Sequence, residues 1–167
     1  MIYYTNIDTP IGILGLVRDA DLLLRISLPN EEISKLALRK IYQNEDIVEN
    51  KSGFEDTINQ LTEYFDGKRQ VFTIKTKFET SPFYTKVLEE VTRVPYGKTV
   101  SYSQIAQKLK NPKATRAVGT ANARNPLPII IPCHRIIANN NKLGGYAGGL
   151  KMKKYLLKFE RENLNLA

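Results

Sequence analysis

The sequence contains only one cysteine and one histidine in 167 residues, which excludes several kinds of site at once. A single cysteine cannot form an internal disulfide, and one cysteine with one histidine cannot provide the four ligands of a structural zinc site without recruiting carboxylates. No apolar run approaches the roughly 18 residues that cross a bilayer. The N-terminus lacks the basic and apolar blocks of a secretory signal. We therefore expect a cytoplasmic protein without metal, cofactor or membrane anchor.

Acidic residues are scarce in the second half of the chain. Residues 1–80 contain 10 Lys+Arg and 13 Asp+Glu, a net charge of −3, whereas residues 81–167 contain 15 and 4, a net charge of +11; together they give the +8 of the whole chain. A concentrated positive field attracts polyanions, and nucleic acid is the commonest partner of this kind. The alternative is a basic surface that serves only solubility.

The first 78 residues combine strand and helix patterns. Short apolar runs bounded by Gly, Pro and Asp indicate strands, and apolar residues at helical spacing indicate helices. The expected strands are 1–4, 12–17, 22–27 and 71–78, and the expected helices are 31–42 and 54–65. We expect an α+β N-terminal domain over residues 1–78, built on a small antiparallel sheet.

Residues 79–167 carry mainly helical signals. Ser81-Pro82 suits the N-cap and first position of a helix, and Ser101 with Gln104 has the pattern of a capping box. Another helix is expected from Asn111-Pro112 onward, after a turn of about three residues. Two short helices joined in this way predict a helix-turn-helix in a mainly helical C-terminal domain. An αα-hairpin that serves only the core is the alternative.

The single cysteine and the single histidine are adjacent, as Cys133 and His134. A thiol becomes a nucleophile as the thiolate, and a neighbouring imidazole can take its proton directly or through water. The alternative is a small core cysteine beside an unrelated histidine. Many glycines follow within residues 144–149, as expected where the backbone approaches another surface closely or takes positive φ.

The string Pro132-Cys133-His134-Arg135 resembles the active-site motif of the O6-alkylguanine–DNA alkyltransferases. The resemblance covers essentially all of residues 81–162 and is weaker in the first half, at 9–12 and 64–67. Further matching segments are Pro95–Gly97, Val100–Tyr102, Asn111-Pro112, Arg116–Gly119, Arg124–Pro126, Gly145–Leu150, Leu156-Leu157 and Glu160.

The resemblance implies catalytic roles for five residues. Cys133 would attack the alkyl carbon. His134, bridged to the thiol by water and oriented by Glu160, would hold that thiol deprotonated, in a relay similar to hydrolase triads. Asn125 would support this hydrogen-bonded network. Tyr102 would donate a hydrogen bond to the base as negative charge develops on the departing guanine.

The resemblance also implies how the protein holds damaged DNA. Arg116 would fill the gap that the flipped nucleotide leaves in the base stack. Tyr146 would wall the pocket, the backbone amide of Ala147 would face the guanine oxygen, and Lys153 lies where the family places an active-site lysine. The residues that would touch the phosphodiester backbone are Ser103, Asn111 and Asn139.

The activity that the resemblance implies is direct reversal of DNA alkylation. A methyl or small alkyl group would pass irreversibly from O6 of guanine, or O4 of thymine, to Cys133, so that one transfer consumes one molecule of a methylated-DNA–protein-cysteine methyltransferase. We expect a monomer that binds double-stranded DNA in the minor groove. The first alternative is a sensor that flips alkylguanine without transfer, although such relatives replace the motif cysteine. A cysteine hydrolase would leave the charge asymmetry unexplained, and a DNA-binding regulator would need no lone thiol beside a lone histidine.

Overall fold

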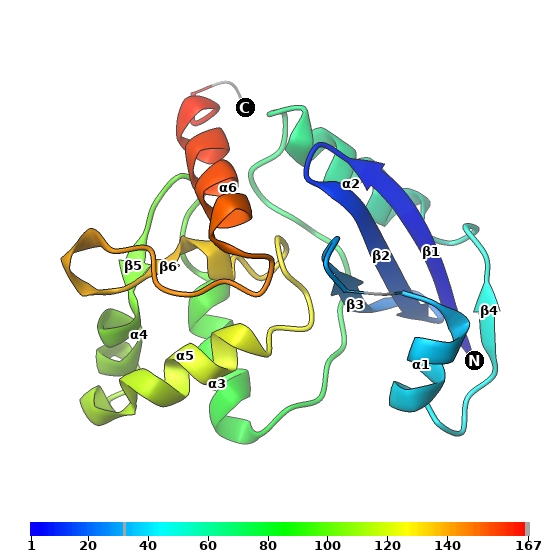
Figure 1. Cartoon of the computed structure of the whole chain (residues 1–167), viewed down its shortest axis with the longest axis horizontal. Coiled ribbons are helices and arrows are strands. Elements are labelled where there is room, and N and C mark those ends of the chain that lie inside the picture. The colour runs from blue at the N-terminus through cyan, green and yellow to red at the C-terminus, as the bar shows by residue number, and fades with distance from the viewer. Residues whose placement is uncertain (32, 166–167) are drawn as a thin grey trace. The chain divides into compact units, whose positions relative to one another are not determined.

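The computed structural model describes residues 1–31 and 33–165 (Figure 1). The chain forms two compact units, one from Met1 to Phe78 and one that begins at Glu79. None of the helices in these described residues is long and apolar enough to cross a membrane.

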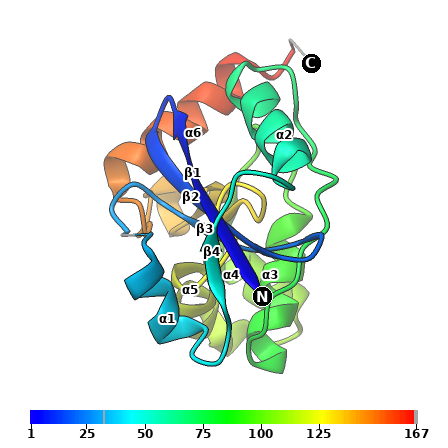
Figure 2. The same ribbon diagram turned by 90° about the vertical axis from the view of Figure 1, so that its right-hand side faces the viewer.

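A four-stranded sheet forms the centre of the N-terminal unit, with the strand order β3-β2-β1-β4 (Figures 1 and 2). The three longer strands, β1 (Ile2–Thr9), β2 (Gly12–Asp19) and β3 (Leu22–Ser27), pair antiparallel as expected. The short strand β4 (Ile47–Glu49) was not predicted, and it pairs parallel with β1. The sheet is therefore mixed, because the connection through helix α1 (Lys35–Ile41) returns the chain in the direction of β1.

The helices of this unit lie within the predicted ranges. Helix α1 begins later than residue 31 because Ser34 provides its N-cap, accepting a hydrogen bond from the Ala37 amide. Helix α2 spans Glu55–Phe65. A small core joins the sheet to α1, and its buried members are Ile2, Tyr4, Val17, Leu38 and Ile47.

The predicted strand over residues 71–78 is wrong. This segment contacts β3 through a single bridge between Thr76 and Leu23. Nearby, the side chain of Gln60 accepts a hydrogen bond from the Thr73 amide and donates one to its hydroxyl. Because a helix side chain satisfies a backbone group that a sheet ladder would need, the alternating pattern does not form a continuous strand.

The second unit is mainly helical. The Ser81 cap and the capping box between Ser101 and Gln104 are both confirmed. Its α-helices are α3 (Pro82–Thr92), α4 (Tyr102–Lys108), α5 (Thr115–Ala123) and α6 (Leu150–Glu162). The shorter elements are β5 (Val100–Ser101), η1 (Pro112–Ala114), η2 (Cys133–Arg135), β6 (Ile136–Ile137) and η3 (Asn139–Asn141).

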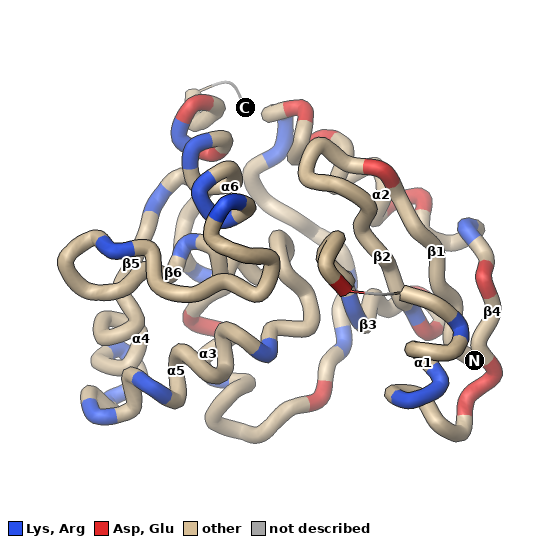
Figure 3. Tube along the Cα trace, viewed as in Figure 1, with Lys and Arg blue, Asp and Glu red and all other residues tan. Residues whose placement is uncertain are grey.

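Helices α4 and α5 form the predicted helix-turn-helix. The second helix does not begin at once after Asn111, because a turn of 3-10 helix, η1, precedes α5. Both helices contact α3, and they bury Ile105 and Val118 between them and the core. Figure 3 shows lysine and arginine along α4, α5 and α6, with few acidic residues in this unit. The exposed basic residues around the helix-turn-helix are Lys108, Lys110, Lys113, Arg116 and Arg124.

Candidate active site

A tight turn delivers Cys133 to its position. The side chain of Asn125 donates to the carbonyl of Ile131 at 2.8 Å and accepts from the amide of Leu127 at 2.9 Å. Between them Ile129 is fully buried and has φ of 75°, a conformation that costs a β-branched residue on the order of 1–3 kcal/mol. The packing and the two hydrogen bonds of Asn125 therefore hold the backbone in a strained path just before Cys133.

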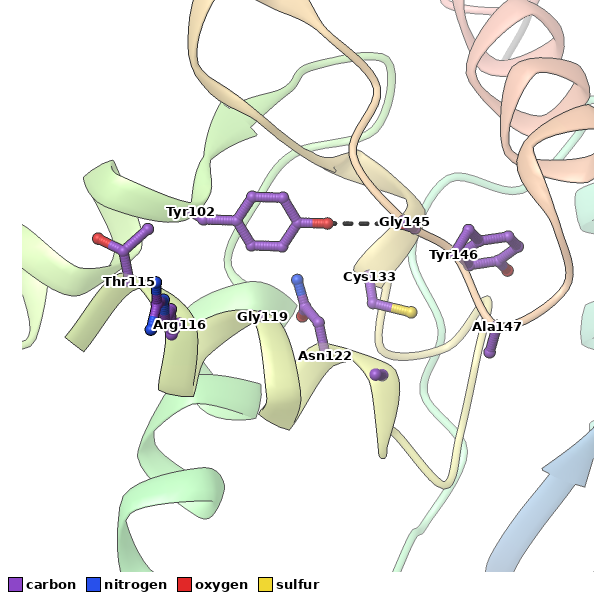
Figure 4. A pocket seen from close by; sticks show the side chains of 10 residues that line it. Tyr102, Thr115, Arg116, Gly119, Asn122, Cys133, Gly145, Tyr146 and Ala147 are labelled. Carbon is purple, nitrogen blue, oxygen red and sulfur yellow. Dashed lines mark hydrogen bonds between the residues drawn. The ribbon is translucent and has the colours of Figure 1, made fainter.

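The thiol of Cys133 lies at a cavity of about 480 Å³ (Figure 4). Its residue is only 6% exposed, so the sulfur is shielded from bulk solvent yet reaches an open space. One wall comes from the helix-turn-helix and the other from the glycine-rich segment before α6. The lining residues are Tyr102, Thr115, Arg116, Gly119, Asn122, Ala123, Cys133, Gly145, Tyr146 and Ala147.

His134 points into a buried ionic network rather than toward solvent. Its Nε2 lies 2.7 Å from Oε1 of Glu160. The same carboxylate accepts two hydrogen bonds from the guanidinium of Arg135, at 2.9 and 3.0 Å, and one from the amide of Gly97 at 3.0 Å. Arg135 also donates to the carbonyl of Val94. Since Arg135 balances the charge of Glu160, the carboxylate stays buried without requiring a charged histidine.

The pKa values of this pair follow from their surroundings. Burial raises the pKa of the Glu160 carboxyl, but the hydrogen bonds from His134 and Arg135 and the charge of Arg135 outweigh burial and lower that pKa to about 2. Burial lowers the pKa of His134, although Glu160 acts in the opposite direction. The ring is then neutral at pH 7, and because the carboxylate can only accept, the proton is assigned to Nε2. Its Nδ1 has no hydrogen-bond partner in the part of the chain that the structure describes.

Burial also raises the pKa of the Cys133 thiol. A hydrogen bond from Asn125 and the charge of Lys153 act in the opposite direction without reversing this effect. Lys153 is itself fully buried, donates to the carbonyls of Ile136 at 2.6 Å and Gly145 at 3.1 Å, and has a pKa lowered by burial to about 8. The unmodified protein therefore holds a protonated thiol, with an acceptor and a cation nearby.

Tyr102 faces the cavity from the start of α4. Its hydroxyl donates to the carbonyl of Gly145 at a long distance of 3.4 Å, and burial raises its pKa, so the group is a phenol at neutral pH. Gly144 has φ of 68°, and a Cβ there would lie 2.8 Å from the Tyr102 ring. Only glycine lets the loop pass the ring at this position.

Comparison with known proteins places the chain in a family. Residues 82–162 match the family model described as the 6-O-methylguanine DNA methyltransferase DNA-binding domain, and residues 2–78 match the ribonuclease-like domain of the same methyltransferase. The chain belongs to the 6-O-methylguanine DNA methyltransferase family. The resemblance first indicated by the residues around Cys133 is thereby confirmed over both halves of the chain.

Individual relatives of this methyltransferase family are similar over almost their full length. The methylated-DNA–protein-cysteine methyltransferase of Methanosarcina mazei is 43% identical over 162 residues, which cover 97% of this chain and 99% of the relative. The constitutive enzyme of Bacillus subtilis is 40% identical, with 96% of each chain covered. The crystal structure of Mycobacterium tuberculosis OGT in complex with DNA aligns with a TM-score of 0.87 and 33% identity, covering 96% of this chain and 94% of that one.

The structure brings most of the site residues expected of a methyltransferase together. Tyr102, Arg116, Tyr146 and Ala147 line the cavity with Cys133. Of the remaining expected residues, His134 and Glu160 lie in the buried ionic network, whereas Asn125 and Lys153 bind backbone groups near Cys133 and the cavity wall. Ser103, Asn111 and Asn139 do not line the cavity. Among the described residues, no three or more Cys, His, Asp or Glu side chains gather as a metal site.

The three residues expected at the DNA backbone do not form one cluster. The hydroxyl of Ser103 donates to the side chain of Asn139 at 2.8 Å. Asn111 lies at the other end of α4, where it precedes η1 with its side chain exposed. Phosphate contacts at these positions stay a prediction.

Two site residues of this methyltransferase were missed from the sequence. Arg135 belongs to the motif itself, but the order of residues in the motif does not reveal that its guanidinium points inward and binds Glu160. Asn122 lies one helical turn after the buried Val118, so it falls on the core side of α5. A polar residue on such a face was the available signal.

Proposed function

We propose that this chain reverses alkylation damage by moving a methyl or small alkyl group from O6 of guanine, or O4 of thymine, in double-stranded DNA to Cys133. The observation that carries this proposal is the cavity at which Cys133 and the helix-turn-helix residue Arg116 meet. A nucleophile and a DNA-binding element share one open space. Membership of the methyltransferase family supports the same activity.

The proposed chemistry needs a proton acceptor as well as a nucleophile. The Sγ atom of Cys133 attacks the alkyl carbon opposite the C–O6 bond, so that an S–C bond forms while the C–O6 bond breaks with its electron pair. The thiol proton passes, directly or through water, to the neutral His134 at Nδ1, which later releases it to solvent. The departing guanine anion takes a proton at N1 from solvent. Tyr102 donates a hydrogen bond to the base while negative charge develops on it.

In this mechanism the thiol of Cys133 is not ionised before the substrate binds. Because burial raises the pKa of Cys133, the proton leaves during the reaction rather than beforehand. Lys153 then stabilises the developing thiolate by its charge, and Asn125 by its hydrogen bond. The product is a thioether, and the chain has no second cysteine that could accept the group. One transfer therefore inactivates one molecule.

The reaction requires the base to leave the duplex. Extrusion costs a few kcal/mol, less for a mispaired base, and a side chain that fills the gap offsets part of this cost. Arg116 is exposed in the first turn of α5 at the cavity, where it can take that place. Small residues on the same helix, Ala117 and Gly119, permit close approach in the minor groove. The basic second half of the chain supplies affinity for DNA that does not depend on the DNA sequence. We also propose that the protein acts as a monomer in the cytoplasm.

The test is to incubate the protein with duplex DNA containing O6-methylguanine and to measure the intact mass. We expect a single added methyl group, mapped to the peptide containing Cys133, and no addition to Cys133→Ala, which still binds DNA. Unmodified protein that nevertheless binds the damaged duplex would support the sensor instead. Repeated turnover by one protein molecule would contradict the stoichiometric mechanism.

A further inference from the structure

Asn122 is a buried polar residue that the proposed mechanism does not use. It lies on α5, is 6% exposed and lines the same cavity as Cys133. In Figure 4 its side chain rises from the helix toward Tyr102 and Cys133. Neither its Nδ2 nor its Oδ1 has a hydrogen-bond partner within residues 1–31 and 33–165.

Burying a carboxamide without partners is costly for the fold. Leaving a buried donor or acceptor without a partner costs about 1–3 kcal/mol, and leucine would fill a similar space without that cost. Asn125, three residues later, shows the contrast, because both ends of its carboxamide bind backbone groups. Asn125 supports the fold, whereas the carboxamide of Asn122 is available to a ligand in the cavity.

The chemistry of a carboxamide indicates which ligand it fits. It offers a donor and an acceptor side by side, the pattern that lets asparagine pair with the edge of a nucleobase through two hydrogen bonds. An O6-alkylguanine presents an acceptor at N1 next to a donor, the 2-amino group. An O4-alkylthymine presents two acceptors, N3 and O2. A carboxamide can therefore satisfy both of its atoms with the guanine and only one with the thymine.

We infer that Asn122 determines base specificity in this site, with Nδ2 donating to N1 of the extruded O6-alkylguanine and Oδ1 accepting from its 2-amino group. This inference rests on the proposed alkyl transfer. Its consequence is that the protein prefers alkylated guanine to alkylated thymine, because a thymine leaves Oδ1 buried and unpaired.

Three substrates and two variants test this role. Single-turnover transfer rates are measured on duplexes with O6-methylguanine, with O6-methylhypoxanthine, which lacks the 2-amino group, and with O4-methylthymine. Asn122→Leu keeps the side-chain volume and removes both hydrogen bonds. Thr120→Ala is the matched control, because Thr120 lies exposed on the same helix outside the cavity.

We expect the native protein and Thr120→Ala to act on O6-methylguanine about tenfold faster than on the other two bases. A tenfold ratio corresponds to the free energy of about one hydrogen bond to the base. In Asn122→Leu the three rates should converge, chiefly through loss on O6-methylguanine. An unchanged ratio, or an equal loss on all three bases, would overturn the inference. The methyl adduct on Cys133 is measured with the native protein alone. If the native protein acquires no adduct, the proposed function fails, whatever the role of Asn122.

Thermal unfolding of Asn122→Leu gives a second, independent outcome. If the carboxamide serves only the bound base, the variant should unfold at the same or a higher temperature than the native protein. A lowered unfolding temperature would show that Asn122 supports the fold instead, and would overturn its assignment as a base-reading residue.

Discussion

The carboxylate of Glu160 lies 2.7 Å from Nε2 of His134, and neither side chain is exposed to solvent. The contact fixes the orientation of the imidazole and directs its protonated nitrogen away from the proposed proton transfer. Burial keeps the imidazole itself uncharged, and the charge of Arg135 acts in the same direction. The buried network thus holds the imidazole in one orientation.

Replacing Glu160 with glutamine should both slow transfer and change the response to acid. The variant leaves Arg135 without its charge partner, and we expect a loss of about 3–5 kcal/mol in unfolding free energy at pH 7. In the native protein the pKa of this carboxyl lies at about 2, below its ordinary 4.5. Its stabilisation is therefore complete above pH 4.5 and is lost as the pH falls toward 2.

Urea unfolding of both proteins between pH 6 and pH 3 provides the measurement. The difference between native and Glu160→Gln free energies should shrink as the pH falls below 4.5. A difference that stays constant across this range would mean that the carboxylate contributes no linked stability.

Lys153 should give a pH dependence of the same sign as Glu160, but in the alkaline range. Its pKa in the folded protein is about 8, below its ordinary 10.5, so between these values the unfolded chain binds more protons than the folded one. The native protein should therefore gain up to about 1.4 kcal/mol per pH unit relative to Lys153→Met as the pH rises from 8 to 9.5. Denaturant titrations at several pH values check this slope. Two parallel curves would indicate that the lysine keeps its ordinary pKa.

Gly119 should show stability and function moving in opposite directions. A Cβ at this position of α5 would meet nothing within 4 Å, so alanine fits the folded protein. We expect Gly119→Ala to gain about 1 kcal/mol of unfolding free energy from its higher helix propensity. The variant should transfer the methyl group from duplex DNA about tenfold more slowly, because the added methyl group occupies space at the cavity where the DNA must come close. Thermal unfolding and single-turnover rates measure the two effects. A more stable variant with full activity would show that this space is not needed.

Arg116→Ala should impair transfer only where a base must be extruded. We expect a drop of about tenfold or more on duplex DNA, with an unchanged rate on free O6-methylguanine base, because the free base needs no gap to be filled. Lys158→Ala is the control, since it removes one exposed positive charge from α6 outside the cavity. If both variants lose the same fraction of their transfer rate on duplex DNA, Arg116 contributes only its positive charge and does not fill the gap in the base stack.

Local patterns in the sequence predicted most helices and strands, because capping hydrogen bonds and the spacing of apolar residues involve only neighbours along the chain. The capping residues Ser81 and Ser101 set helix starts, and they do so in the structure. Strand β4 and the single bridge at Thr76 were not predictable, because pairing between distant segments decides both. A three-residue strand has no pattern of its own, and an alternating segment becomes a strand only where a neighbour accepts its hydrogen bonds.

The sequence by itself determined the family and singled out Cys133 and His134 as the candidate reactive pair, because each is unique in the chain and the surrounding motif is specific. Only the tertiary structure decided their electrostatic state. Burial keeps the thiol protonated and the histidine neutral, and it leaves the carboxamide of Asn122 open to the cavity. A linear sequence lists which groups can ionise or hydrogen-bond. Which of them lose water, and which find partners, depends on contacts that form only when distant segments pack together.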